Sequence, residues 1–241
     1  HDHHMRDGAV RDQQPALMAL GDSITQCKAP NSCYRRYLYR TFTANGIDVR
    51  WVGSMIGMQA GKEVGMNISA GRPVPLTDWP LEVQRHEGHW GWTARQLVMG
   101  HERQPQRGKL AGWLRELQHE GQLPHVVLLH IGTNDLTKHV VREGGHVRGT
   151  VASVRAVLVR LCTVRPTLKV VLATLIPFCR GNASTLIRRR AIEHEYGNRL
   201  RALTKNGIVA CPQMQLVLVN MSQQVHCTHL SRDGVHPAPA G

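Results

Sequence analysis

Short apolar runs alternate along this chain with segments that carry the spacing of amphipathic helices. The runs are rich in Val, Leu and Ile and lie at residues 16–20, 49–52, 126–131, 170–176 and 216–219. The helical patterns between them lie at about residues 33–44, 93–99, 111–119, 146–161 and 184–204. Continuous apolar runs are typical of buried parallel strands, and parallel strands need crossover connections. The alternation therefore predicts an α/β fold with a five-stranded, mainly parallel sheet.

The length and composition fit one globular domain. The chain has 241 residues, of which 41% are hydrophobic and 20% charged, so neither a disordered nor a fibrous chain is expected. The apolar runs are too short to span a bilayer, and no signal-peptide pattern is visible, so we predict no membrane partner. We expect a flexible tail over residues 1–14, a single domain over 15–241, and a long loop over the Gly- and Pro-rich residues 57–88.

The net charge of +13 would suit a polyanionic partner such as nucleic acid. Residues 142–205 hold thirteen Lys and Arg but only three Glu, a net charge of +10. This segment has one Phe and one Tyr, too few for a base-stacking surface. An apolar helix face runs through Val151, Val154, Leu158 and Leu161. We therefore interpret the arginines, including the consecutive residues 188–190, as a solvated helix surface and predict no specific nucleic-acid site.

The six cysteines are scattered, with no Cys-x-x-Cys pair, so the pattern predicts no zinc site. Cys27 and Cys33 are close enough in sequence for a local disulfide, but sequence does not give connectivity. Disulfides and buried thiols both stay open, and so does the redox compartment.

Polar residues follow three of the predicted strands. Because ligands of such sheets lie beyond the carboxyl ends of the strands, these residues are the candidate site. They are Gly21-Asp22-Ser23 after the first run, Gly132-Thr133-Asn134-Asp135 after the third, and Asp233-Gly234-Val235-His236-Pro237 beyond the last.

These residue types suit nucleophilic attack on an ester. A serine hydroxyl needs a base, and His236 would take the proton of Ser23 if folding brings the two together. Asp233 precedes His236 by three residues, a spacing at which its carboxylate can orient the imidazole. The oxyanion that forms needs donors, for which the candidates are the Ser23 amide, a glycine amide and the Asn134 side chain.

The same residues resemble the motifs of the SGNH hydrolases, also called the GDSL esterase family. Gly91 supplies the remaining block, and all four blocks occur in the family's order. The longer segments LGDSITQ, HEGHWGWT and LLHIGTNDL look most like those of the carbohydrate-esterase branch that includes acetylxylan esterases. The resemblance implies a three-layer α/β/α sandwich with a flavodoxin-like SGNH hydrolase fold, no cofactor, no metal and an extracellular location.

The resemblance also implies roles. Ser23 would be the nucleophile, His236 the base and Asp233 its orienting partner, while Gly91 and Asn134 would complete an oxyanion hole with the Ser23 amide. The chain departs from the family in two places. Trp90 stands where relatives often carry a small residue, and its indole, like that of Trp92, suits either a sugar-stacking or a packing role. The sequence also ends five residues after His236, so we expect the domain to lack the usual C-terminal helix.

The leading hypothesis is a serine esterase, similar to the acetylxylan esterases, that removes acetyl or another short acyl group from a carbohydrate through an acyl-enzyme on Ser23. Its substrate would be a small-molecule or polysaccharide ester. A lipid ester or thioester hydrolase of the same fold is the enzymatic alternative, because chain-length preference depends on the pocket walls. A noncatalytic polyanion-binding protein that uses residues 142–205 is the alternative from another class. The oligomeric state is open.

Overall fold

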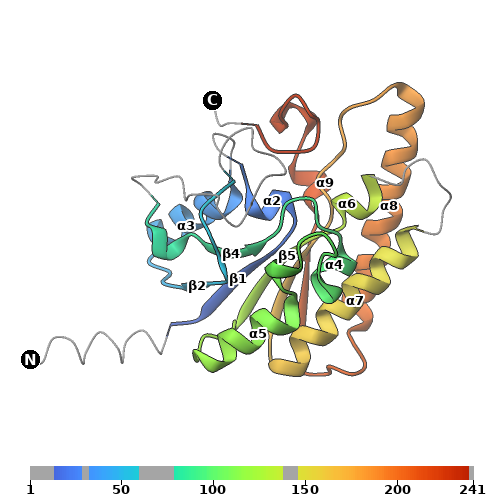
Figure 1. Cartoon of the computed structure of the whole chain (residues 1–241). Helices are drawn as coiled ribbons and strands as arrows, with labels where there is room; N and C mark the ends of the chain where they lie inside the picture. The colour runs from blue at the N-terminus through green and yellow to red at the C-terminus, as the bar shows by residue number, and fades with distance from the viewer. Residues whose placement is uncertain (1–13, 29–32, 60–78, 138–145, 239–241) are drawn as a thin grey trace, which may run out of the picture.

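The computed structural model describes residues 14–28, 33–59, 79–137 and 146–238, and its centre is one mainly parallel sheet (Figure 1). The strand order is β3-β4-β1-β5-β6-β7, and β2 pairs with the first half of β1. Neighbouring strands are parallel, apart from the antiparallel pair β3 and β4. The strands are β1 (Ala16–Gly21), β2 (Arg50–Val52), β3 (Met55–Ile56), β4 (Arg85–Gly88), β5 (Val126–His130), β6 (Lys169–Ala173) and β7 (Gln215–Val219).

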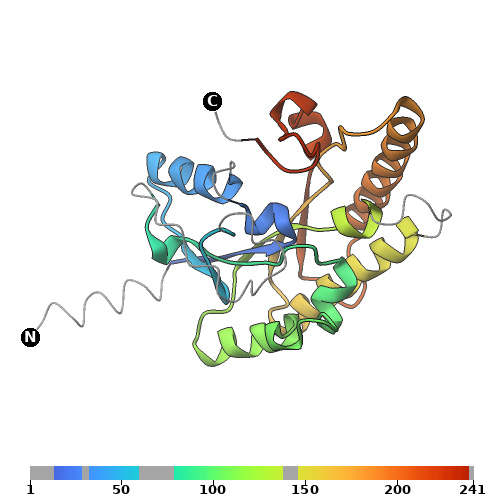
Figure 2. The ribbon, with the colours of Figure 1, turned by 45° about the horizontal axis from the view of Figure 1, so that its top comes forward.

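Helices cover both faces of this sheet (Figure 2). Successive side chains of a strand point to opposite faces, so β1 contributes to two apolar clusters. Leu17 and Ala19 pack with α3 (Tyr34–Ala44), whereas Met18 and Leu20 belong to the larger cluster on the other face. The helices of that larger cluster are α4 (Ala94–Met99), α5 (Leu110–His119), α7 (His146–Val164) and α8 (Ala183–Asn206).

Three short helices begin at the carboxyl ends of strands. They are α2 (Ser23–Gln26) after β1, α6 (Thr133–Thr137) after β5 and α9 (Met221–Gln224) after β7. In Figure 1 they gather at the upper end of the sheet. This arrangement brings the polar residues that follow separate strands to one edge, as the sequence predicts.

The α/β/α architecture and all five predicted strands are confirmed, but the strand number is wrong. Over the residues that the structure describes, the sheet has seven strands, because β3 and β4 join it. The sequence of β4 is Arg-His-Glu-Gly, which has no apolar run to reveal a strand. Its polar groups are buried with partners instead: Glu87 accepts hydrogen bonds from the Ser54 backbone and hydroxyl and contacts the His89 ring. The expectation of a loop over residues 57–88 is therefore wrong for residues 85–88, which form β4.

Two other expectations fall partly or wholly outside the described residues. Residues 60–78 of the expected loop and residues 1–13 of the expected tail lie outside the described residues. Within the described ranges, no helix has both the length and the apolar character of a membrane span.

All six cysteines form disulfides, which pair Cys27 with Cys33, Cys162 with Cys211 and Cys179 with Cys227. Such bonds are typical of proteins from oxidising environments. The Cys179–Cys227 bond joins the segment after β6 to the segment that follows α9. We call residues 226–238 the terminal loop.

Backbone contacts add to the disulfide in holding the terminal loop. The Cys179 N–H donates to the Gly234 carbonyl oxygen at 2.9 Å, and the Ser231 N–H donates to the His236 carbonyl oxygen at 2.7 Å. Leu230 and Pro237 form an antiparallel bridge across the loop. Gly234 has a φ of 68° and lies so close to Arg180 that a Cβ would approach its backbone nitrogen to 2.8 Å. Glycine is therefore required at this turn.

A buried arginine links α2 to two neighbouring segments. The Arg35 side chain is fully buried, and its guanidinium donates to the carbonyl oxygens of Thr25, Gln26, Gly57 and Gln84 at 2.7–3.0 Å. These acceptors belong to α2, to the residues after β3 and to the residue before β4. One side chain therefore donates to four buried carbonyl groups around α2 and the start of β4.

Replacing this guanidinium should be costly. Arg35→Met keeps an apolar stem but removes a charged donor from each of four buried acceptors, so we expect the free energy of unfolding to fall by about 3 kcal/mol or more in a urea titration. The matched control is Arg148→Met on the exposed face of α7, with an expected change of about 0.5 kcal/mol or less. Equal losses in the two variants would contradict this role for Arg35.

The two long-range disulfides allow a matched test of how the terminal loop is held. Cys179–Cys227 and Cys162–Cys211 span 48 and 49 residues, so loop-closure entropy predicts a similar loss for each, about 4 kcal/mol. We expect Cys179→Ala with Cys227→Ala also to accelerate hydrogen exchange at the Ser231 and Gly234 amides, measured under native conditions. The Cys162→Ala with Cys211→Ala control should leave that local exchange slow. Equal exchange in both variants would show that other contacts hold the loop.

Candidate active site

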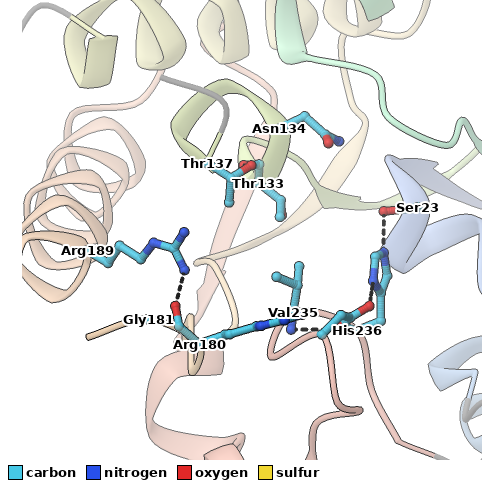
Figure 3. A pocket seen from close by; sticks show the side chains of 10 residues that line it. Ser23, Thr133, Asn134, Thr137, Arg180, Gly181, Arg189, Val235 and His236 are labelled. Atoms are coloured by element: carbon cyan, nitrogen blue, oxygen red, sulfur yellow. Dashed lines mark hydrogen bonds and ion pairs between the residues drawn. The ribbon is translucent and has the colours of Figure 1, made fainter. Parts of the chain in front are cut away.

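The structure brings Ser23, His236 and Asp233 into one hydrogen-bonded chain (Figure 3). The Ser23 hydroxyl lies 2.8 Å from His236 Nε2, and His236 Nδ1 lies 2.7 Å from Asp233 Oδ2. A carboxylate at Nδ1 favours the tautomer with the proton on that nitrogen, which leaves Nε2 free to accept the serine proton. Ser23 and His236 are 213 positions apart in the sequence, and the parallel topology makes them neighbours.

Ser23 is held at the start of α2, where its side chain is almost fully buried. Asp22 caps this helix through Oδ1, which accepts a hydrogen bond from the Ile24 N–H at 3.0 Å. Burial raises the pKa of the Asp22 carboxyl, against the opposing effect of nearby His130. The capping bond gives Asp22 a local structural role and fixes the backbone that presents Ser23.

Asp233 is organised by four donors. Its Oδ1 accepts from the Ser231 hydroxyl at 2.8 Å and from the Val235 and His236 N–H groups at 2.9 Å each. Partial burial alone would raise the pKa of Asp233, but the two backbone donors, the His236 ring and the Ser231 hydroxyl outweigh it and lower the pKa well below its ordinary value. Asp233 therefore remains a carboxylate that faces His236 at neutral pH.

Trp90 stacks on the imidazole of His236. The ring centroids are 4.7 Å apart and the planes differ by 11°. The backbone N–H of Trp90 donates to Gln26 Oε1 at 2.7 Å, and the Lys28 ammonium lies 5.8 Å from the indole centroid. The sequence offered sugar stacking or packing as roles for this residue, and the structure shows its indole packed against the histidine ring.

Trp92 is fully buried, so packing is correct for this second indole. It stacks with the ring of His89 at 4.4 Å between centroids. Its carbonyl oxygen accepts a hydrogen bond from Asn134 Nδ2 at 2.9 Å, which fixes the position of that side-chain amide. Gly91, between the two tryptophans, has a φ of 78°, a conformation that favours glycine.

A cleft of about 490 Å³ opens beside Ser23 (Figure 3). Three elements at the carboxyl edge of the sheet line this cleft: α2, α6 and the terminal loop. The start of α8 also contributes to the lining. The lining residues are Ser23, Thr133, Asn134, Thr137, Arg180, Gly181, Arg189, Asp233, Val235 and His236. The predicted residues Ser23, Asn134, Asp233 and His236 thus share one cavity.

Two lining arginines were not predicted as site residues. Arg188 and Arg190 are exposed, as a solvated helix surface requires, but Arg189 is half-buried and lines the cleft. The interpretation of residues 188–190 as solvated is therefore wrong for Arg189. Three consecutive arginines give no signal of which one faces a cavity, because that depends on how α8 packs. Among the described residues, no group of three or more His, Cys, Asp or Glu could hold a metal ion.

Solved structures of similar fold include several esterases, each less than 25% identical to this chain. A carbohydrate esterase of family 3 from Talaromyces cellulolyticus has a TM-score of 0.64 at 23% identity, covering 93% of this chain and 88% of that one. A family 3 carbohydrate esterase from Clostridium thermocellum has a TM-score of 0.62 at 23% identity, with 94% and 88% covered. An acetylxylan esterase from Geobacillus stearothermophilus has a TM-score of 0.54 at 15% identity, with 93% and 87% covered.

The sequence itself assigns the family. No curated protein sequence matches the chain significantly. The model of the GDSL-like lipase/acylhydrolase family matches residues 19–241, which include every block of the candidate site. The chain therefore belongs to the GDSL-like lipase/acylhydrolase family and is a carboxylic ester hydrolase.

Proposed function

We propose that this protein is a serine esterase that removes acetyl or another short acyl group from a carbohydrate. The observation that carries the proposal is the hydrogen-bonded chain from Ser23 through His236 to Asp233 at the wall of an open cleft. Each member of this chain has the partner that its role requires.

In the first step the Ser23 oxygen attacks the ester carbonyl carbon, and its proton passes to His236 Nε2. The Asp233 carboxylate stabilises the imidazolium that forms. Collapse of the tetrahedral intermediate breaks the bond to the alcohol oxygen, which takes the proton from Nε2 and leaves the acyl group on Ser23. Water then attacks the acyl-enzyme with His236 again as base, which releases the carboxylic acid and restores Ser23.

The oxyanion would be stabilised by the Ser23 amide, the Gly91 amide and the Asn134 side chain. One N–H of the Asn134 amide is committed to the Trp92 carbonyl oxygen, and this bond positions the other for the oxyanion. Donors fixed before the reaction need no reorganisation when the charge develops. The short α2 also starts at Ser23, so the Ser23 amide is one of its unpaired first-turn donors.

The cleft lining favours a carbohydrate over a lipid acyl chain. Hydroxyl, amide and guanidinium groups make up about half of the described lining surface, and Val235 is its single aliphatic side chain. Sugar hydroxyls can exchange hydrogen bonds with such groups, whereas a long acyl chain needs an apolar wall. The carbohydrate and acetylxylan esterases of similar fold support the same choice of substrate.

Removal of the nucleophile tests the mechanism. Ser23→Ala should lower kcat for 4-nitrophenyl acetate by about 10⁴-fold or more, because no other group can form the acyl-enzyme. Ser153→Ala, at a half-buried serine of α7 that does not line the cleft, is the matched control and should retain wild-type turnover. A Ser23→Ala protein that is folded by circular dichroism and hydrolyses the ester at the wild-type rate would refute the proposal.

The stack on His236 predicts a positioning role for Trp90. Loss of an aromatic pair costs about 1 kcal/mol, so Trp90→Leu should lower kcat roughly fivefold with little change in KM. Trp90→Phe keeps an aromatic face and should restore most of that loss. Steady-state kinetics on 4-nitrophenyl acetate separates the two parameters. A change confined to KM, or equal kcat losses in both variants, would contradict positioning of the imidazole.

A further inference from the structure

We infer that the preferred substrate is an ester of an acidic carbohydrate, and that Arg189 is the residue that selects it by binding a sugar carboxylate. This inference rests on the proposed esterase function and specifies its substrate class. The starting point is the charge of the cleft wall beside the terminal loop, which Arg180 and Arg189 line together.

The Arg189 guanidinium is held in a fixed position on that wall. Its Nη1 donates to the Arg180 carbonyl oxygen at 2.6 Å, and its guanidinium carbon lies 5.5 Å from the centroid of the Phe178 ring. Figure 3 shows the side chain reaching from α8 toward the cleft. Within the described part of the chain, Nη2 has no hydrogen-bond partner. An arginine that is fixed at one edge and open at another is preorganised for a second ligand.

The acidic residues near Arg189 offset its charge only in part, and Glu193 interacts electrostatically with both Arg189 and Arg190. Glu193 lies one helical turn along α8, but its Oε1 accepts a hydrogen bond from the Phe178 N–H at 2.8 Å, and it forms no ion pair with Arg189 among the described residues. Asp233, the acidic residue of the cleft lining, is committed to His236, Ser231 and two backbone donors. The cleft therefore presents positive charge to a substrate.

A carboxylate is the anion that fits this geometry on a carbohydrate. The planar guanidinium donates parallel hydrogen bonds that match two carboxylate oxygens, and charge-assisted bonds are stronger than neutral ones. Uronic acids carry such a carboxylate on the sugar ring. The long-range field acts in the same direction, because residues 142–205 carry a net charge of +10 and include α7 and α8.

The test compares two acetylated oligosaccharides of equal length, one of xylose and one of galacturonic acid, and measures kcat/KM for release of acetate from each. The wild type should prefer the galacturonate substrate. Arg189→Gln should lower the ratio of kcat/KM for the acidic over the neutral substrate by about tenfold or more. Arg189→Lys keeps the charge but lacks the planar guanidinium, so its ratio of kcat/KM should lie between those of the wild type and Arg189→Gln.

Arg188→Gln is the matched control, since it removes the same charge from an exposed neighbour on α8 and should leave the ratio within about twofold of the wild type. Equal preference for both substrates in the wild type, or equal loss of preference in Arg188→Gln and Arg189→Gln, would overturn the inference alone. Absence of hydrolysis of 4-nitrophenyl acetate as well as of both oligosaccharides would overturn the proposed function and the inference with it.

Discussion

The hydrogen bond between Ser23 and His236 is the contact on which the function of this molecule depends, and it joins the first strand of the sheet to the last described loop. Neither residue has its partner nearby in sequence. β1 is fully buried and places Ser23 at the sheet edge. His236 lies on a loop, whose position must be fixed by other contacts. The Cys179–Cys227 disulfide, the Cys179–Gly234 backbone bond and the stack of Trp90 on the imidazole provide that fixation.

Part of the interior behind the site is polar, and two of its buried charged side chains have several hydrogen-bond partners. Arg35 satisfies four carbonyl groups around α2, and Glu87 is bonded to Ser54 and His89 inside the sheet. Buried polar networks of this kind cost free energy if one member is lost, but when complete they favour one backbone arrangement. A nucleophile that must meet a distant base within hydrogen-bond length benefits from such a rigid support.

The strands and helices that pack through apolar faces could be predicted from sequence, because their periodicity reflects burial directly. β4 could not, since Glu87 and His86 are buried through polar partners. Ser23, Asn134, Asp233 and His236 could be placed at one edge because parallel strands end together. The contact of Trp90 with His236, the pairing of Cys179 with Cys227 and the orientation of Arg189 depend on tertiary packing, which no local pattern encodes.

The most direct test of the account is to identify the covalent intermediate. The protein would be mixed with 4-nitrophenyl acetate, quenched with acid within milliseconds, digested and analysed by mass spectrometry. The account predicts one added acetyl group on the peptide that contains Ser23, and its disappearance on further incubation before the quench. Acetyl transfer to another residue that turns over at the steady-state rate, with Ser23 unmodified, would contradict Ser23 as the nucleophile.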